Sequence, residues 1–144
     1  MKSLLTILIS VIVIASLVFG SSLVASSATD SNNPGPNVVV ADSVVKWDTT
    51  AKIQILGCGF KPEQEIHLLI TDVNGVLADF TMYACTPVPV TNEQGAWATE
   101  WTGLGRMLSR KLITPGAYAI VVANENYETL AAAPIWVLEQ EEQK

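Results

Sequence analysis

The chain has 144 residues, 49% of them hydrophobic and 15% charged, with a formal net charge of −6. This length suits one domain of ordinary size, and the hydrophobic content excludes a chain that is disordered throughout. The acidic balance argues against nucleic-acid binding, which needs a basic surface, and one His and two Cys leave few groups for a metal or catalytic site.

The first predicted element is an apolar N-terminal segment. Lys2 precedes residues 4–19, which carry no charge, and small residues follow up to Ala28. A positive start, an apolar stretch and a small-residue exit are typical of a secretory signal peptide that is cleaved after Ala25 or Ala28. The alternative is an uncleaved anchor helix, because residues 4–25 are just long enough to span a bilayer. Both interpretations of residues 1–28 place the rest of the chain outside the cytoplasm, secreted or anchored to the cell membrane.

The rest of the chain divides into a tether, one domain and a tail. Residues 29–37 are polar with two Pro and one Gly, which is typical of a flexible linker, and residues 139–144 form an acidic tail. Between them, residues 38–138 show apolar residues alternating with period two in short runs. The predicted strands cover residues 38–45, 52–56, 65–71, 76–83, 96–101, 117–123 and 135–138. About seven short strands separated by Gly, Pro and Asn turns predict an all-β sandwich.

One predicted hairpin has a register that follows from its hydrophobic pattern. A three-residue turn over residues 73–75 pairs Ile70 with Ala78 and Leu68 with Phe80, which collects the apolar side chains on one face. The polar side chains, His67 and Asp79 among them, then share the other face.

The same register predicts the position of the two cysteines. Counting outward from the turn, Cys85 falls beside the loop over residues 57–62, which contains Cys58. In an exported protein a single pair of this kind favours a disulfide over two free thiols. We therefore expect a disulfide between Cys58 and Cys85.

Three segments carry a resemblance to a known family. Residues 53–66 (IQILGCGFKPEQEI), 92–97 (NEQGAW) and 115–120 (PGAYAI) resemble stretches of exported immunoglobulin-like (Ig-like) modules of bacteria and archaea. The resemblance implies an Ig-like β-sandwich of about seven antiparallel strands, with Tyr118 in a tyrosine corner. It implies surface display, adhesion or spacer roles and provides no catalytic residues. The short cysteine spacing, with no Trp between the cysteines, sets the chain apart from antibody domains.

Catalytic and metal-binding chemistry have little support in the sequence. His67 could form a triad with Asp79, but no nucleophile motif accompanies them, so a hydrolase centred on His67 is the least favoured function. Zinc lacks closely spaced Cys and His ligands. Residues 72–75 (DVNG) resemble a calcium loop only in part, and a turn explains them better. We predict no catalytic residue, no metal site and no cofactor.

Two groups of residues are candidates for ligand binding. Trp97 and Trp101 share one strand face, which is more typical of a core, whereas Trp47 and Trp136 have polar neighbours and could form an exposed sugar-binding platform.

The second group is a basic segment that interrupts the alternating pattern. Arg106, Arg110 and Lys111 put three positive charges within six positions. They are either the solvated residues of a crossover whose leucines cap the sandwich, or a docking site for an acidic partner, an anionic headgroup or a cell-wall polymer.

Taken together, these features predict a non-catalytic, extracytoplasmic Ig-like binding or structural module at the cell surface. Its partner would be a cell-envelope protein or an extracellular polymer. The alternative is a carbohydrate-binding module that uses exposed Trp.

Overall fold

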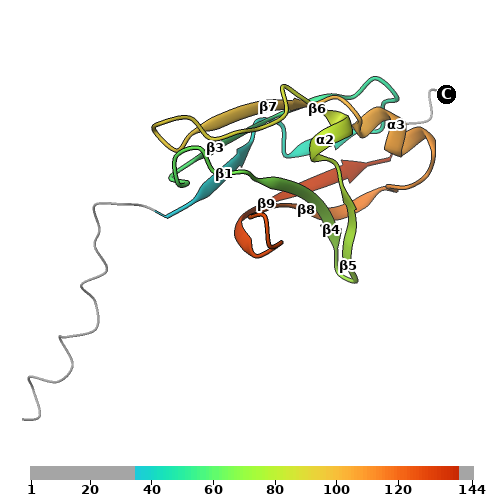
Figure 1. The fold of residues 1–144 in the computed structure, drawn as a ribbon. Coiled ribbons are helices and arrows are strands. Elements are labelled where there is room, and N and C mark those ends of the chain that lie inside the picture. The colour runs from blue at the N-terminus through green and yellow to red at the C-terminus, as the bar shows by residue number, and fades with distance from the viewer. Residues whose placement is uncertain (1–34, 140–144) are drawn as a thin grey trace, which may run out of the picture. The chain divides into compact units, whose positions relative to one another are not determined.

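The computed structural model describes residues 35–139, which form a β-sandwich of two sheets with two short helices (Figure 1). The predicted export segment (1–28), most of the predicted tether (29–37) and most of the predicted tail (139–144) lie outside the described residues. In the part that is described, no helix is long and apolar enough to cross a membrane.

The two sheets contain strands from both halves of the chain. The four-stranded sheet contains, in order across the sheet, β1 (Asn37–Val40), β3 (Ile53–Cys58), β7 (Trp97–Trp101) and β6 (Cys85–Thr86). The five-stranded sheet contains β2 (Val44–Lys46), β9 (Thr129–Leu138), β8 (Gly116–Ala123), β4 (His67–Asp72) and β5 (Gly75–Asp79). The all-β prediction is therefore confirmed.

The first predicted strand (38–45) is divided between the two sheets. β1 runs antiparallel to β3, whereas β2 runs parallel to β9. The polar residues 41–43 separate them, and the backbone N–H of Trp136 donates to the carbonyl of Ser43 at 2.7 Å. This switch lets one N-terminal segment cover an edge of each sheet.

The hairpin of β4 and β5 has the predicted register but a different turn. Ile70 lies opposite Ala78 as expected, yet Asp72 pairs with Gly75, so the turn contains two residues and the predicted three-residue turn is wrong. The register shifts after Ile70, which places the extra residue in a bulge within β5. The Asp72 carboxylate accepts the N–H of Asn74 at 2.7 Å, and this bond fixes the tight turn.

The predicted strand over residues 76–83 ends early, at Asp79. The buried Thr81 hydroxyl accepts the N–H of Leu68 at 2.6 Å and donates to Asp79 at 2.6 Å, so a side chain replaces the next backbone bond of the ladder. Helix α2 (Thr81–Ala84) then carries the chain to the four-stranded sheet, where β6 begins.

The hydrophobic core lies between the sheets. Trp97 and Trp101 both point into it, as the sequence favours, and the Trp101 ring stacks on Phe80 with centroids 4.2 Å apart. Gly57 lies opposite Trp97, and a Cβ on Gly57 would come within 2.2 Å of the indole. Helix α3 (Leu104–Ser109) closes one end of the sandwich with the buried Leu104 and Leu108.

Candidate functional site

The predicted disulfide is not formed: Cys58 is exposed, Cys85 is buried, and both thiols are free. Cys58 lies opposite Asn37, whereas Cys85 lies opposite Trp101, which pairs with Ile53 at the other end of β3. These levels are five residues apart along β3, or about 17 Å, which exceeds the about 7 Å limit between the Cα atoms of bonded cysteines. The prediction fails because α2 leads the chain into β6 of the same four-stranded sheet at the end where β3 begins, whereas Cys58 lies where β3 ends. Burial raises the pKa of the Cys85 thiol to about 11.

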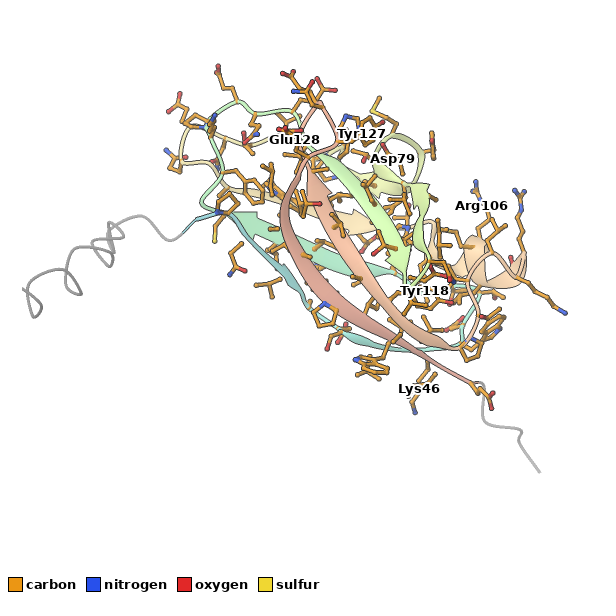
Figure 2. All side chains as sticks on the ribbon, turned by 90° about the horizontal axis from the view of Figure 1, so that it is seen from below. Lys46, Asp79, Arg106, Tyr118, Tyr127 and Glu128 are labelled. Carbon is orange, nitrogen blue, oxygen red and sulfur yellow. The ribbon has the colours of Figure 1, made fainter. Side chains whose placement is uncertain are left out.

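The candidate basic residues lie at the end of the sandwich that α3 closes, which we call the α3 end. Arg106, Arg110 and Lys111 are exposed, while Leu104 and Leu108 of the same helix fill the core. This arrangement agrees with the crossover expectation, since Leu104 and Leu108 cap the sandwich and the cations face solvent, although Leu112 is exposed. Docking of an acidic partner stays a prediction. Figure 2 shows Arg106 on α3, apart from Tyr127 and Glu128.

The two candidate Trp residues differ in exposure. Trp136 on β9 is 52% exposed on the outward face of the five-stranded sheet. Trp47 follows β2 and is half-buried against the core. Lying at different depths, the two do not form a matched pair of exposed rings.

The most connected polar cluster in the described residues surrounds His67, Asp79 and Tyr127. His67 Nδ1 lies 2.8 Å from Asp79 Oδ2, and the Tyr127 hydroxyl donates to the same oxygen at 3.2 Å. The Tyr127 ring also packs on the imidazole, with centroids 4.6 Å apart. The sequence predicts that His67 and Asp79 share a face, but Tyr127 was missed because it comes from the β8–β9 loop.

Hydrogen bonds set the ionisation of this cluster. Burial of Asp79 acts to raise its pKa, but bonds from the Thr81 hydroxyl, the Thr81 N–H and His67 outweigh it and hold the pKa below its ordinary value. Partial desolvation and the neighbouring Asp79 carboxylate raise the pKa of Tyr127. The cluster therefore keeps a carboxylate charged and the imidazole fixed in orientation.

The cluster holds an oriented base without a nucleophile beside it. Within residues 35–139, no hydroxyl or thiol hydrogen-bonds to the His67 ring, and no group of three His, Cys, Asp or Glu side chains could hold a metal. In covalent hydrolysis a side-chain nucleophile lies in hydrogen-bond contact with its base. The geometry fits a brace that joins β4, β5 and the β8–β9 loop.

The end opposite α3 is formed by the loops after β3, β6 and β8, and we call it the loop end. A hollow of about 520 Å³ lies there, lined by polar residues 61–65 and 124–126. Five acidic side chains gather at this end with a single cation, Lys61: Glu63, Glu65, Glu93, Glu125 and Glu128. The two ends of the sandwich therefore differ in charge.

Comparison with protein-family models and with characterised proteins finds no match for this chain.

Proposed function

We propose that this chain is an exported, non-catalytic Ig-like module that binds a partner at the cell surface. The observation that carries the proposal is the strand order. In Ig domains one sheet has the order A-B-E-D and the other contains G, F and C, with C′ added in larger members. The order β1-β3-β7-β6 and the order β9-β8-β4-β5 fit these two patterns, and β2 extends the first strand beside β9.

Tyr118 gives independent support to the Ig-like assignment. It lies near the start of β8, where an Ig domain has its F strand. Its hydroxyl donates to the carbonyl of Thr114 at 2.9 Å and accepts the N–H of Thr114 at 3.1 Å. A tyrosine that bonds back to the backbone a few residues upstream defines the tyrosine corner of such domains.

The segments that resemble exported Ig-like modules have structural roles. The Phe60 N–H donates to the carbonyl of Gly95 at 3.1 Å, and the Phe60 ring packs on Trp97 with centroids 5.9 Å apart. A Cβ on Gly95 would come within 2.0 Å of the Phe60 carbonyl oxygen, and its φ of +70° also favours glycine. These contacts hold two loops together, so the three segments have a structural role. Partner binding then falls to the exposed surface.

We assign partner binding to the α3 end because it carries most of the positive charge of the described chain. Arg106, Arg110 and Lys111 are exposed there, with Lys46 at the end of β2. Lys52 at the start of β3 is paired with Glu100, and Asp48 lies at the same end. The described chain also starts at the loop end, since Asn37 pairs with Cys58. An exported module tethered through its N-terminus would present the α3 end to an anionic envelope protein or polymer.

Export is tested by labelling the free thiols of the full chain on intact cells. A membrane-impermeant maleimide should react with the exposed Cys58, and the variant Cys58→Ser should lose the label because Cys85 is buried. Labelling that requires lysed cells would place the domain inside the cell and overturn the proposal.

Partner binding is tested by sedimenting the protein with isolated cell envelopes. Association should weaken with added salt and fall at least tenfold in the double variant Arg106→Glu, Arg110→Glu, since anionic partners are held by charge. The matched control is Lys61→Glu, a charge reversal at the loop end that should bind like the wild type. Equal binding by the double variant and the wild type would remove the α3 end as the binding site.

Carbohydrate binding through Trp136 is the second candidate, favoured by the 52% exposure of its side chain. A polysaccharide that stacks on this ring should change the Trp fluorescence, and Trp136→Ala should abolish the change while Trp47→Ala retains it. No response across a broad glycan panel would exclude this function.

A further inference from the structure

The outward face of the five-stranded sheet is almost free of charge. Alternation along each strand turns the following side chains to this face: Val44, Ala132, Pro134, Trp136, Leu138, Ala117, Ala119, Val121, Thr71 and Val76. Leu69 also turns to this side but is only 4% exposed. The charged groups on it are Lys46 at one edge and the paired His67 and Asp79 at a corner. The outward face of the four-stranded sheet is more mixed: it carries Gln54, Thr86 and Glu100 beside the exposed Val39 and Leu56.

This composition departs from what a solvated sheet face requires. An antiparallel sheet with one face in water places polar residues at the outward positions, and a contiguous apolar patch marks an interaction site. The central strand β8 has only Ala117, Ala119 and Val121 at these positions. Because the outward side chains of β8 are small, the face is flat there, and the larger Trp136 side chain projects from it on one side.

A hollow of about 260 Å³ lies on the other side of the central strand. Residues 117–119 of β8 form one wall, and Thr71, Asp72 and Val73 form the other. The volume falls below the about 300–1,000 Å³ of ordinary small-molecule pockets, so the hollow suits one large side chain.

The strand order places the Trp136 side chain and this hollow symmetrically about β8. β8 is the middle strand of five; Trp136 lies one strand to one side, level with Ala117, and β4 lies one strand to the other. Thr71 pairs with Ala119, so Val73 falls at the level of Ala117. A two-fold axis along β8 would therefore place Trp136 of each copy over the hollow of the other, in one self-complementary contact.

The size and charge of the face also fit a second copy of this chain. The five strands contain 32 residues, which at about 3.3 Å per residue and about 4.8 Å between strands cover about 500 Å². Two copies would bury about 1,000 Å², the size at which specific interfaces begin. A protein with a net charge of −6 repels its own copies wherever acidic groups meet. The acidic groups at this face both have hydrogen-bond partners within the chain: Asp79 contacts His67 and Tyr127, and the Asp72 carboxylate accepts the N–H groups of the hairpin turn.

We propose that two copies of this chain pair face to face through the five-stranded sheets, with each Trp136 seated in the other copy's hollow beside Ala119. The two-fold axis runs along β8, so both chains enter the dimer from the loop end. Both copies of an exported module could then be tethered to the same surface. The dimer does not depend on the α3 end and is independent of the partner proposed there.

The test is site-directed cross-linking of the full chain in a Cys58→Ser background, with mild detergent present. Ala119→Cys lies on the axis, where sheets packed about 10 Å apart bring two copies of residue 119 within reach of a short bis-maleimide. The matched control is Leu56→Cys, an exposed position on the outward face of the four-stranded sheet. We expect a covalent dimer with Ala119→Cys and none with Leu56→Cys.

A second variant separates this interface from association through other parts of the chain. Trp136→Asp added to Ala119→Cys should abolish the cross-link, and Trp136→Asp alone should weaken dimerisation at least tenfold in a concentration series of molar mass measurements. Cooperative unfolding of each variant, followed by circular dichroism, checks that it is folded. Equal cross-linking at positions 56 and 119, or a wild type that stays monomeric, would overturn the proposal. A monomer whose Trp136 binds a glycan would also overturn it and assign the face to that ligand.

Discussion

The two sheets of the sandwich differ in which face carries their tryptophan side chains. The four-stranded sheet turns Trp97 and Trp101 inward. Its outward face carries a Lys52–Glu100 ion pair and other polar side chains beside the exposed Val39 and Leu56. The five-stranded sheet turns aliphatic residues such as Ile120 and Ile135 inward and exposes Trp136. Residue type alone therefore does not say whether a tryptophan lies in the core or on the surface. Its position in the strand alternation and the neighbouring strands determine this.

The largest expected effect comes from comparing one inward tryptophan, Trp101, with one outward tryptophan, Trp136. Trp101 is fully buried and stacked on Phe80, so Trp101→Ala should lower the free energy of unfolding by about 3–5 kcal/mol. Trp136→Ala, measured on the monomer in dilute urea-unfolding experiments, should cost less than about 1 kcal/mol because its side chain is half in solvent. Equal losses would mean that the outward face supports the fold, and the contrast would fail.

Strand parity explains how much of the fold could be predicted. The spacing of Trp97 and Trp101 indicates that they share a face and favours the core, and the inward position is confirmed. The register of Ile70 with Ala78 is confirmed for the same reason, since the alternating pattern defines which residues share a side.

What the pattern missed depends on single side chains and on distant loops. The Thr81 hydroxyl accepts the N–H of Leu68 where β5 ends. The chain then continues through α2 to β6, where Cys85 lies far from Cys58. Tyr127 joins the His67 cluster from 48 positions beyond Asp79. No local pattern reports such a contact, because it depends on how β8 and β9 fold back over β4.

The second test concerns Asp79, which contacts His67 on the five-stranded sheet. Asp79 has a lowered pKa, so its ionised form stabilises the fold above the ordinary value of 3.8, and this stability is lost as the pH falls through the lower folded value. Asp79→Asn should therefore cost about 1–2 kcal/mol at neutral pH, because the charged acceptor of His67 and Thr81 is removed. Urea unfolding as a function of pH should show the difference from wild type shrinking below about pH 4.

The exposed Glu125→Gln is the matched control for that experiment, since it changes one acidic side chain that lies in solvent. It should leave the free energy of unfolding within about 0.5 kcal/mol of wild type. A difference between Asp79→Asn and wild type that persists unchanged into acid would show that the carboxylate charge is not what stabilises the cluster.

The smallest expected effect belongs to the ion pair on the four-stranded sheet. Lys52 and Glu100 lie 3.2 Å apart, but their side chains are 58% and 38% exposed, against 18% and 24% for His67 and Asp79. Water and salt screen the exposed pair, so Lys52→Ala should change the free energy of unfolding by about 0–0.5 kcal/mol, and added salt should remove the difference. Urea unfolding at low and high salt measures both effects. A loss above about 1 kcal/mol would mean that the polar face of the four-stranded sheet stabilises the fold through its charges. The two outward faces would then differ in composition but not in what they contribute to stability.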